Sequence, residues 1–172
     1  MLSFKQAYGE IEQFIAVSDF SGNPAELYDP ITYSMNLGGK RIRPAMLLMT
    51  AALFNGKKED ALNAAMGIEV FHNFTLVHDD IMDEAPLRRG KETVYKKWNR
   101  DIAILSGDVM FVKAIDFFLK LTPDQQLADV LKVFNKTAAE VCDGQQMDMN
   151  FETQKEVSIA DYIHMIELKT AV

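Results

Sequence analysis

The sequence lacks the features that mark secreted and membrane-spanning proteins. Cys142 is the only cysteine among 172 residues, so no disulfide can form within the chain, and we expect a cytoplasmic protein. No window reaches about 18 uninterrupted apolar residues, so no membrane span is predicted. The first residues also lack the basic segment and apolar run of a signal peptide.

Basic residues are in the minority. The chain has 18 lysines and arginines but 25 aspartates and glutamates, and its formal net charge is −7. No nucleic-acid partner is therefore expected, because such proteins usually present a basic face. Half of the basic residues nevertheless fall within residues 40–43 and 88–100. In an acidic protein, such clusters predict local sites for anions.

Strand patterns are also missing, and the chain reads as helical throughout, which predicts an all-α fold. Helices are expected over residues 3–17, 24–36, 44–54, 58–83, a short piece with Tyr95 and Trp98, 101–121, 123–150, and from 158 onward. Residues 84–93 predict a polar loop. Residues 101–121 are apolar nearly all round, so that helix should be buried on most sides. The last helical pattern has no stop signal before Val172, and we expect a truncated domain.

Three carboxylates gather at the predicted end of the fourth helix. Asp79 and Asp83 share a helix face, and Asp80 lies beside Asp83. The negative end of the helix dipole disfavours such charges, so a compensating cation is expected. Magnesium is a candidate because it prefers oxygen ligands and often bridges one or two carboxylates to substrate phosphates. The alternative is a solvated acidic helix end.

Two basic segments accompany the carboxylates. Arg88 and Arg89 follow them in the polar loop, and residues 38–44, GGKRIRP, place a basic loop before a helix. Helix N-termini with nearby arginine and lysine hold phosphates through amides, dipole and charge. Acidic and basic sites together predict two phosphorylated ligands, one held through metal and one held directly.

With these motifs, the sequence resembles the trans-isoprenyl diphosphate synthase (polyprenyl synthetase) family. The matching phrases, in family order, are GGKRIRP (38–44), HNFTLVHDDIMDEAPLRRGKETVYKKW (72–98), AILSGDVM (103–110), GQQMDM (144–149) and LKTA (168–171). The resemblance implies an antiparallel helical bundle of the isoprenoid synthase type around a central cavity. It also implies condensation of an allylic diphosphate with isopentenyl diphosphate, dependent on Mg²⁺, by a homodimer.

The resemblance assigns roles to individual residues. Metal binding falls to Asp79, Asp80 and Asp83. Isopentenyl diphosphate binding falls to Lys40, Arg43, His72 and Arg89. Allylic diphosphate binding falls to Arg88, Lys169, Thr170 and Gln145, with Asp148 on the same polar face as Gln145. Among these, Asp79, Asp80, Asp83, Arg88 and Lys169 are expected to take part in catalysis. His72 could instead be a core or capping histidine, and Lys169 a surface lysine.

Aromatic residues before the aspartates predict the product length. In the family, bulky side chains one to two turns upstream form the floor of the tail pocket, and here those positions hold Phe74, Thr75 and Phe71. An aromatic floor leaves little room, so we expect a C15 or C20 product. Phe74 could alternatively pack only against a neighbouring helix.

The sequence departs from the family in one respect, because no second DDxxD motif occurs. We therefore expect residues 1–172 to be the N-terminal part of a single isoprenoid synthase domain, inactive alone. Three rival interpretations remain: a terpene cyclase, which would not need the GGKRIRP loop, a non-catalytic partner subunit of a prenyl synthase, and a plain helical interaction module.

Overall fold

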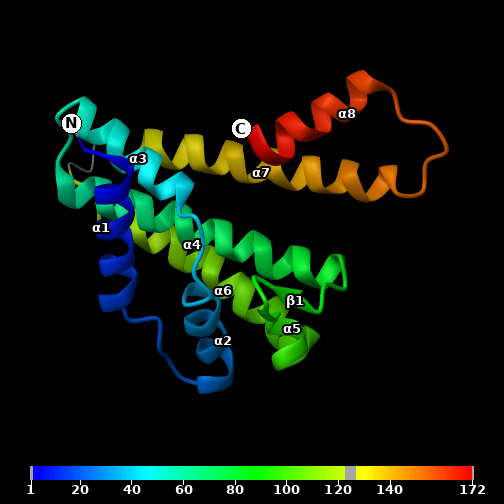
Figure 1. Ribbon diagram of the computed structural model, residues 1–172, viewed down its shortest axis with the longest axis horizontal. Coiled ribbons are helices and arrows are strands. Elements are labelled where there is room, and N and C mark those ends of the chain that lie inside the picture. Colours follow the sequence, from blue (N-terminus) through cyan, green and yellow to red (C-terminus); the bar gives the residue numbers. More distant parts are fainter. Residues whose placement is uncertain (1, 123–126, 172) are drawn as a thin grey trace. The chain divides into compact units, whose positions relative to one another are not determined.

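A computed structural model describes residues 2–122 and 127–171, which are almost entirely helical. The elements, labelled in Figure 1, are α1 (Phe4–Val17), α2 (Ala25–Met35), α3 (Ile42–Leu53), α4 (Lys58–Met82), β1 (Leu87–Arg88), β2 (Lys91–Glu92), α5 (Val94–Lys97), α6 (Arg100–Phe118), α7 (Leu127–Phe151), α8 (Ile159–Ile166) and the π-helical turn η2 (Glu167–Ala171). They form two compact units, of which the first ends at Thr122. The predicted all-α class is confirmed.

Some of the helices begin at residues whose side chains cap them. Ser3 caps α1 in a box with Gln6, and the Asn99 side chain accepts a hydrogen bond from the amide of Ile102 at the start of α6. Pro44 lies in the first turn of α3, as predicted, although that helix already begins at Ile42.

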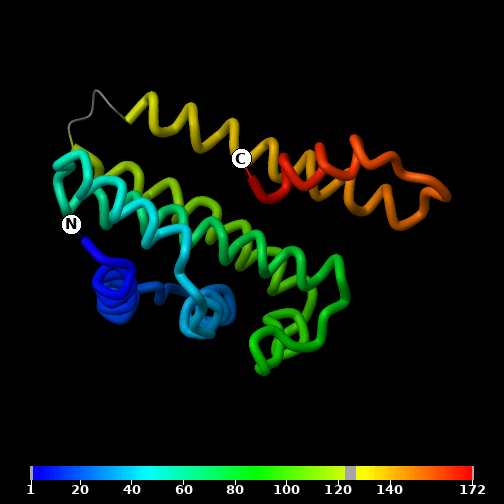
Figure 2. The backbone as a smooth tube through the Cα atoms, turned by 45° about the horizontal axis from the view of Figure 1, so that its top comes forward, coloured from blue at the N-terminus to red at the C-terminus, as the bar shows by residue number. Residues whose placement is uncertain are grey.

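The first unit is built around the antiparallel pair α4 and α6, which run side by side (Figure 1 and Figure 2). One glycine from each helix allows the close approach. A Cβ on Gly67 of α4 would lie 2.8 Å from the Phe118 ring, and a Cβ on Gly107 of α6 would lie 2.3 Å from the imidazole of His78. Each helix therefore receives an aromatic ring from the other, which fixes their register. Helices α1 and α3 pack on α4, and α2 packs on α6.

Two expectations about this unit are wrong. The predicted polar loop 84–93 contains a two-stranded hairpin, in which Leu87 pairs with Glu92 and Arg88 with Lys91. Strands this short, with charged residues, carry no alternating apolar pattern that would reveal them.

Helix α6 is also less buried than its composition predicts. The side chains of Leu105, Val112 and Leu119 are more than half exposed within the described chain. They follow one another at seven-residue spacing on a single face, and α2, α4 and α5 pack on the others. An apolar helix is buried only where partners cover it.

The second unit contains α7, α8 and η2, which pack on one another. The predicted start of its first helix at Pro123 lies outside the described residues. The last predicted helix is found from Ile159, but it changes to a π-helical turn at Glu167. Across both units, none of the described helices is long and apolar enough to cross a membrane.

Candidate functional site

Three of the four residues 38–41, in the basic loop before α3, have unusual backbone conformations. Gly38 and Gly39 have φ values of 76° and 155°, and Arg41 has a φ of 47°. Glycine adopts such angles without steric cost, whereas a side-chain-bearing residue such as arginine does so only when its surroundings hold it there. The turn sends Lys40 and Arg41 in different directions.

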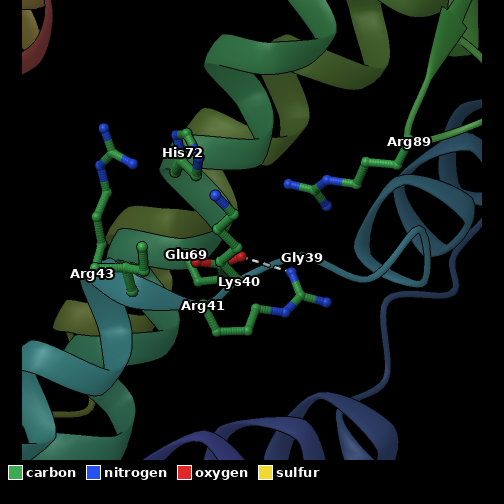
Figure 3. A pocket seen from close by; sticks show the side chains of 8 residues that line it. Gly39, Lys40, Arg41, Arg43, Glu69, His72 and Arg89 are labelled. Carbon is green, nitrogen blue, oxygen red and sulfur yellow. Dashed lines mark hydrogen bonds and ion pairs between the residues drawn. The ribbon is translucent and has the colours of Figure 1, made fainter. Parts of the chain in front are cut away.

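A pocket of about 400 Å³ opens beside this loop in the first unit. It is lined by Gly39, Lys40, Arg41, Ile42, Arg43, Glu69, His72 and Arg89. Figure 3 shows His72 coming from α4, Lys40 and Arg43 from the segment that begins α3, and Arg89 reaching in from the hairpin. The four residues assigned to isopentenyl diphosphate by resemblance therefore lie around one cavity.

The pocket carries uncompensated positive charge. In the part of the chain that the structure describes, Lys40, Arg43 and Arg89 make no hydrogen bond or ion pair with a protein group. Burial lowers the pKa of the Arg89 guanidinium, and the neighbouring charge of Arg41 lowers it further. An anion entering the pocket would relieve this repulsion, and a diphosphate offers enough charge and acceptor oxygens for all three cations.

His72 is a neutral imidazole in this setting. Burial lowers its pKa to about 4, and the positive charges of Arg43 and Arg89 lower it further. At neutral pH it can donate one hydrogen bond to an anion without adding charge. His72 thus lies in the wall of a basic pocket, where the predicted ligand-binding role would place it.

Two pocket residues were missed by the sequence reasoning. Arg41 belongs to the matched phrase but was given no role, and Glu69 lies one turn before His72 on α4. Arg41 donates from Nη1 to Oε1 of Glu69 at 2.5 Å. The i, i+3 spacing from Glu69 to His72 was the available signal for the acidic partner.

The aspartates lie at the C-terminal end of α4, as predicted. Asp79 and Asp80 occupy its last turn, and Asp83 is the residue that caps it. Asp80 is only 3% exposed and accepts hydrogen bonds from Arg88 Nε to both carboxylate oxygens at 2.9 Å. Part of the compensating charge that this helix end requires is therefore supplied by the protein itself.

Burial and the hydrogen bond from Arg88 act in opposite directions on the pKa of Asp80. Burial raises the pKa of the Asp80 carboxyl, the hydrogen bond from Arg88 opposes this rise, and Asp83 adds to it. The same hydrogen bond raises the pKa of Arg88. Arg88, assigned to the allylic diphosphate by resemblance, thus lies directly on the aspartate motif.

The carboxylates do not form a closed metal cage. Among residues 2–122 and 127–171, no group of three or more His, Cys, Asp or Glu side chains is arranged to hold a metal ion. Magnesium, however, commonly takes one or two carboxylates and completes its shell with water and phosphate oxygens. Arg88 engages Asp80, and the carboxylate oxygens of the three aspartates at this helix end are the ligand type that suits an ion bound together with a diphosphate.

The second unit brings together two of its own predicted residues. Lys169 Nζ lies 2.5 Å from Oδ2 of Asp148. The approach is possible because a Cβ on Gly144 would lie 2.4 Å from the amide nitrogen of Lys169. Gln145 follows that glycine on α7, and Thr170 is exposed on η2. The LKTA and GQQMDM phrases are therefore in contact through Lys169 and Asp148.

The predicted tail-pocket floor lies between α4 and α6. The Phe74 ring is 5.6 Å from that of Phe71 and 5.5 Å from that of Phe111 on α6, measured between centroids. His78 lies edge-on to Phe74 at 4.7 Å. Thr75 is part-buried, and its hydroxyl donates to the carbonyl of His72. Phe111 is an aromatic member of this cluster that the sequence reasoning did not include.

Comparisons with known proteins agree with this geometry. A family model described as polyprenyl synthetase matches residues 24–172. A geranylgeranyl diphosphate synthase of Methanosarcina mazei is 42% identical over 150 residues, which are 87% of this chain and 46% of that protein. One of Sulfolobus acidocaldarius is 38% identical and is matched over 91% of this chain and 48% of its own length.

Solved structures give the same result. A crystal structure of a geranylgeranyl pyrophosphate synthase superimposes with a TM-score of 0.95 at 48% identity, covering 100% of this chain and 52% of that one. The synthetase of Pyrococcus horikoshii has a TM-score of 0.88 at 37% identity and is covered over 51% of its chain. The chain thus spans about half the length of the relatives it matches.

Proposed function

The chain belongs to the polyprenyl synthetase family, and from this membership we propose that it provides the isopentenyl diphosphate site and the first aspartate motif of a trans-prenyl diphosphate synthase. The observation that carries the proposal is the pocket lined by Lys40, Arg43, His72 and Arg89. A terpene cyclase or an interaction module would have no need for three cations and a histidine converging from three separate segments.

The proposed reaction joins an allylic diphosphate to isopentenyl diphosphate in a 1′-4 condensation. The carbon–oxygen bond of the allylic substrate breaks, diphosphate departs with the electron pair, and the isopentenyl double bond attacks the resulting cation. A proton is then lost from the condensed product, with the departed diphosphate as its acceptor. No side chain is assigned as a general base.

Each group of residues has a part in this scheme. Lys40, Arg43 and Arg89 bind the isopentenyl diphosphate by charge, and His72 donates one hydrogen bond. Asp79, Asp80 and Asp83 would hold magnesium, which would supply charge stabilisation for the departing diphosphate.

Arg88 would contribute to the same stabilisation. Its guanidinium rests on Asp80, at the helix end that carries the metal-binding carboxylates. In the second unit, Lys169 and Thr170, with Gln145 on α7, are proposed to face the allylic diphosphate. The product is proposed to be a C15 or C20 trans-prenyl diphosphate, because Phe71, Phe74 and Thr75 form the tail-pocket floor. A homodimer is proposed on the family resemblance.

Isothermal titration of the chain with isopentenyl diphosphate tests the pocket without requiring turnover. We expect saturable binding that does not depend on magnesium and that weakens as ionic strength rises, since cations provide the contacts. Arg43→Ala and Arg89→Ala should each reduce affinity at least about tenfold, a common loss when a charge-assisted hydrogen bond is removed. Absence of binding by the wild-type chain would reject the proposal in favour of a helical interaction module.

A further inference from the structure

We propose that Arg41 is a positioning residue of the diphosphate pocket, which turns its guanidinium away from the ligand and anchors the basic loop to three helices. The inference rests on the function proposed above. It separates Arg41 from its neighbours Lys40 and Arg43, although all three belong to one basic phrase of the sequence.

The contacts of Arg41 carry the argument. Its side chain is only 1% exposed, so it is not available to a ligand in the way that the other pocket cations are. Nε donates to Glu12 at 2.8 Å, Nη1 to Glu69 at 2.5 Å, and Nη2 to the carbonyl of Met35 at 2.8 Å. These partners lie on α1, α4 and the end of α2, so one guanidinium connects three elements.

The ion pair between Arg41 and Glu69 connects the basic loop to α4, which forms the opposite wall of the pocket. Glu69 is 2% exposed and precedes His72 by three residues on α4. Its carboxylate also accepts a hydrogen bond from the side-chain amide of Asn73 at 3.1 Å, which holds it in place. Figure 3 shows Arg41 joined to Glu69, with Lys40 extending toward His72 instead. This ion pair thus connects the loop that carries Lys40 and Arg43 directly to the helix that carries His72.

The backbone supports the same assignment. Arg41 adopts a φ of 47°, which is unfavourable for a residue with a side chain and is retained when surrounding contacts hold it there. The three hydrogen bonds provide that restraint. With Arg41 turned inward by this conformation, Lys40 on one side and Arg43 on the other are left free to face the pocket.

Lysine cannot replace Arg41 in this role. A planar guanidinium donates in fixed, divergent directions, whereas an ammonium is a single point charge on a flexible stem. Lysine at this position keeps the charge opposite Glu69 but loses the simultaneous contacts with Glu12 and Met35. The loop then loses its fixed placement while the net charge of the pocket stays the same.

The first experiment compares Arg41→Lys with the wild-type chain by isothermal titration with isopentenyl diphosphate, and inorganic pyrophosphate serves as a second probe. All titrations are run where circular dichroism shows every variant to be folded. We expect Arg41→Lys to bind both probes at least about tenfold more weakly, because a displacement of about 1 Å can cost a positioned site about a hundredfold.

The salt dependence of Kd separates positioning from stability. With the loop displaced, fewer cations face the diphosphate, so the slope of log Kd against log salt should fall in Arg41→Lys as it does in Lys40→Ala. A variant that is only less stable keeps the wild-type slope, because its folded molecules bind with the same cations.

A milder pair of variants decides the question if Arg41→Lys does not fold. Glu12 and Glu10 lie two residues apart on α1, and each is 2.8 Å from a cation of another segment, Arg41 for Glu12 and Lys58 for Glu10. Only Glu12 connects to the loop. We expect Glu12→Ala to weaken isopentenyl diphosphate binding at least about threefold, the effect of losing one of the three anchors, and Glu10→Ala to leave it unchanged.

The outcomes distinguish the inference from the proposed function. If the wild-type chain binds while Arg41→Lys binds equally well, or if Glu12→Ala and Glu10→Ala behave alike, the positioning role of Arg41 is overturned and the pocket assignment stands. If the wild-type chain binds neither probe, the proposed function is overturned and the inference falls with it.

Discussion

At the residue scale, the protonation of His72 should be visible in the stability of the fold. Its pKa is lowered to about 4 by burial and by Arg43, Arg89, Arg88 and Arg41, whereas in the unfolded chain it is near the ordinary value of 6.5. Between these values the unfolded state binds more protons, so the free energy of unfolding decreases as pH falls from about 6.5 to about 4.

The variant His72→Gln removes this proton uptake. We expect its stability relative to wild type to improve by about 2 kcal/mol between pH 7 and pH 4.5, as measured by urea unfolding at the two pH values. The surrounding arginines stay charged throughout, and the acidic groups of the pocket are present in both proteins, so the difference isolates His72. Parallel pH profiles for the two proteins would show that the imidazole is not held neutral.

Arg88 offers a second test at this scale. Removing its charge in Arg88→Met leaves the buried carboxylate of Asp80 without its ion pair, and we expect a loss of about 2 kcal/mol of stability, less than for a fully buried pair because Arg88 is partly exposed. Thermal or urea unfolding measures it.

The double variant Arg88→Met with Asp80→Asn should regain part of the loss. Lys91→Met, an exposed position of the same hairpin, should have no comparable effect. Equal losses in Arg88→Met and Lys91→Met would contradict the importance of the pair.

Sequence reasoning identified most of the charged residues of the pocket, but not the direction in which each side chain points. The phrase GGKRIRP predicted an anion site at Lys40 and Arg43 because basic residues beside a helix start are recognisable from spacing, and both residues line one pocket. That Arg41 turns inward depends on a left-handed backbone angle and on Glu12, which lies 29 residues earlier in the chain. No local pattern contains that information.

At the scale of elements, the α4–α6 pair determines where the aromatic residues of the proposed tail-pocket floor lie. The reciprocal insertion of Phe118 at Gly67 and of His78 at Gly107 holds the helices close, and the rings of Phe71, Phe74 and Phe111 meet between them. The sequence predicted the aromatic residues of α4, but the contribution of α6 follows from the register of two helices. That register was not available from periodicity alone.

Replacing Phe74 should lengthen the product. Phe74→Ala removes a ring from the floor, so the growing prenyl chain of a complete synthase that carries these residues should extend further before it meets a side chain. Chromatographic analysis of dephosphorylated products measures the shift, with farnesyl and geranylgeranyl chains replaced by longer ones.

Phe117→Ala is the matched control for this experiment. Phe117 lies on α6 but contacts Phe14 and Phe20 instead of the floor, so its removal should lower stability without changing product length. An unchanged product spectrum in Phe74→Ala would mean that this ring only packs between helices.

At the scale of the whole molecule, the sequence holds one aspartate-rich motif and spans about half the length of its relatives. The residues that line the pocket, His72 and Arg89 among them, all lie within the first unit, so we expect the proposed binding of isopentenyl diphosphate to need only this unit. Ionisation of the allylic diphosphate requires more of the protein than this binding does, because the charge of the departing diphosphate must be stabilised and the allylic cation must be kept from water. The two steps should therefore be separable in this chain.

We expect the 172-residue chain to bind isopentenyl diphosphate but to show no prenyl transfer with magnesium and dimethylallyl, geranyl or farnesyl diphosphate. Incorporation of labelled isopentenyl diphosphate into extractable product measures turnover. Joining residues 1–172 to the remaining part of the geranylgeranyl pyrophosphate synthase with the matching fold should restore it, and Asp83→Asn in that chimera should abolish it again. Robust turnover by the chain alone would show that a single aspartate-rich motif is sufficient for the ionisation step.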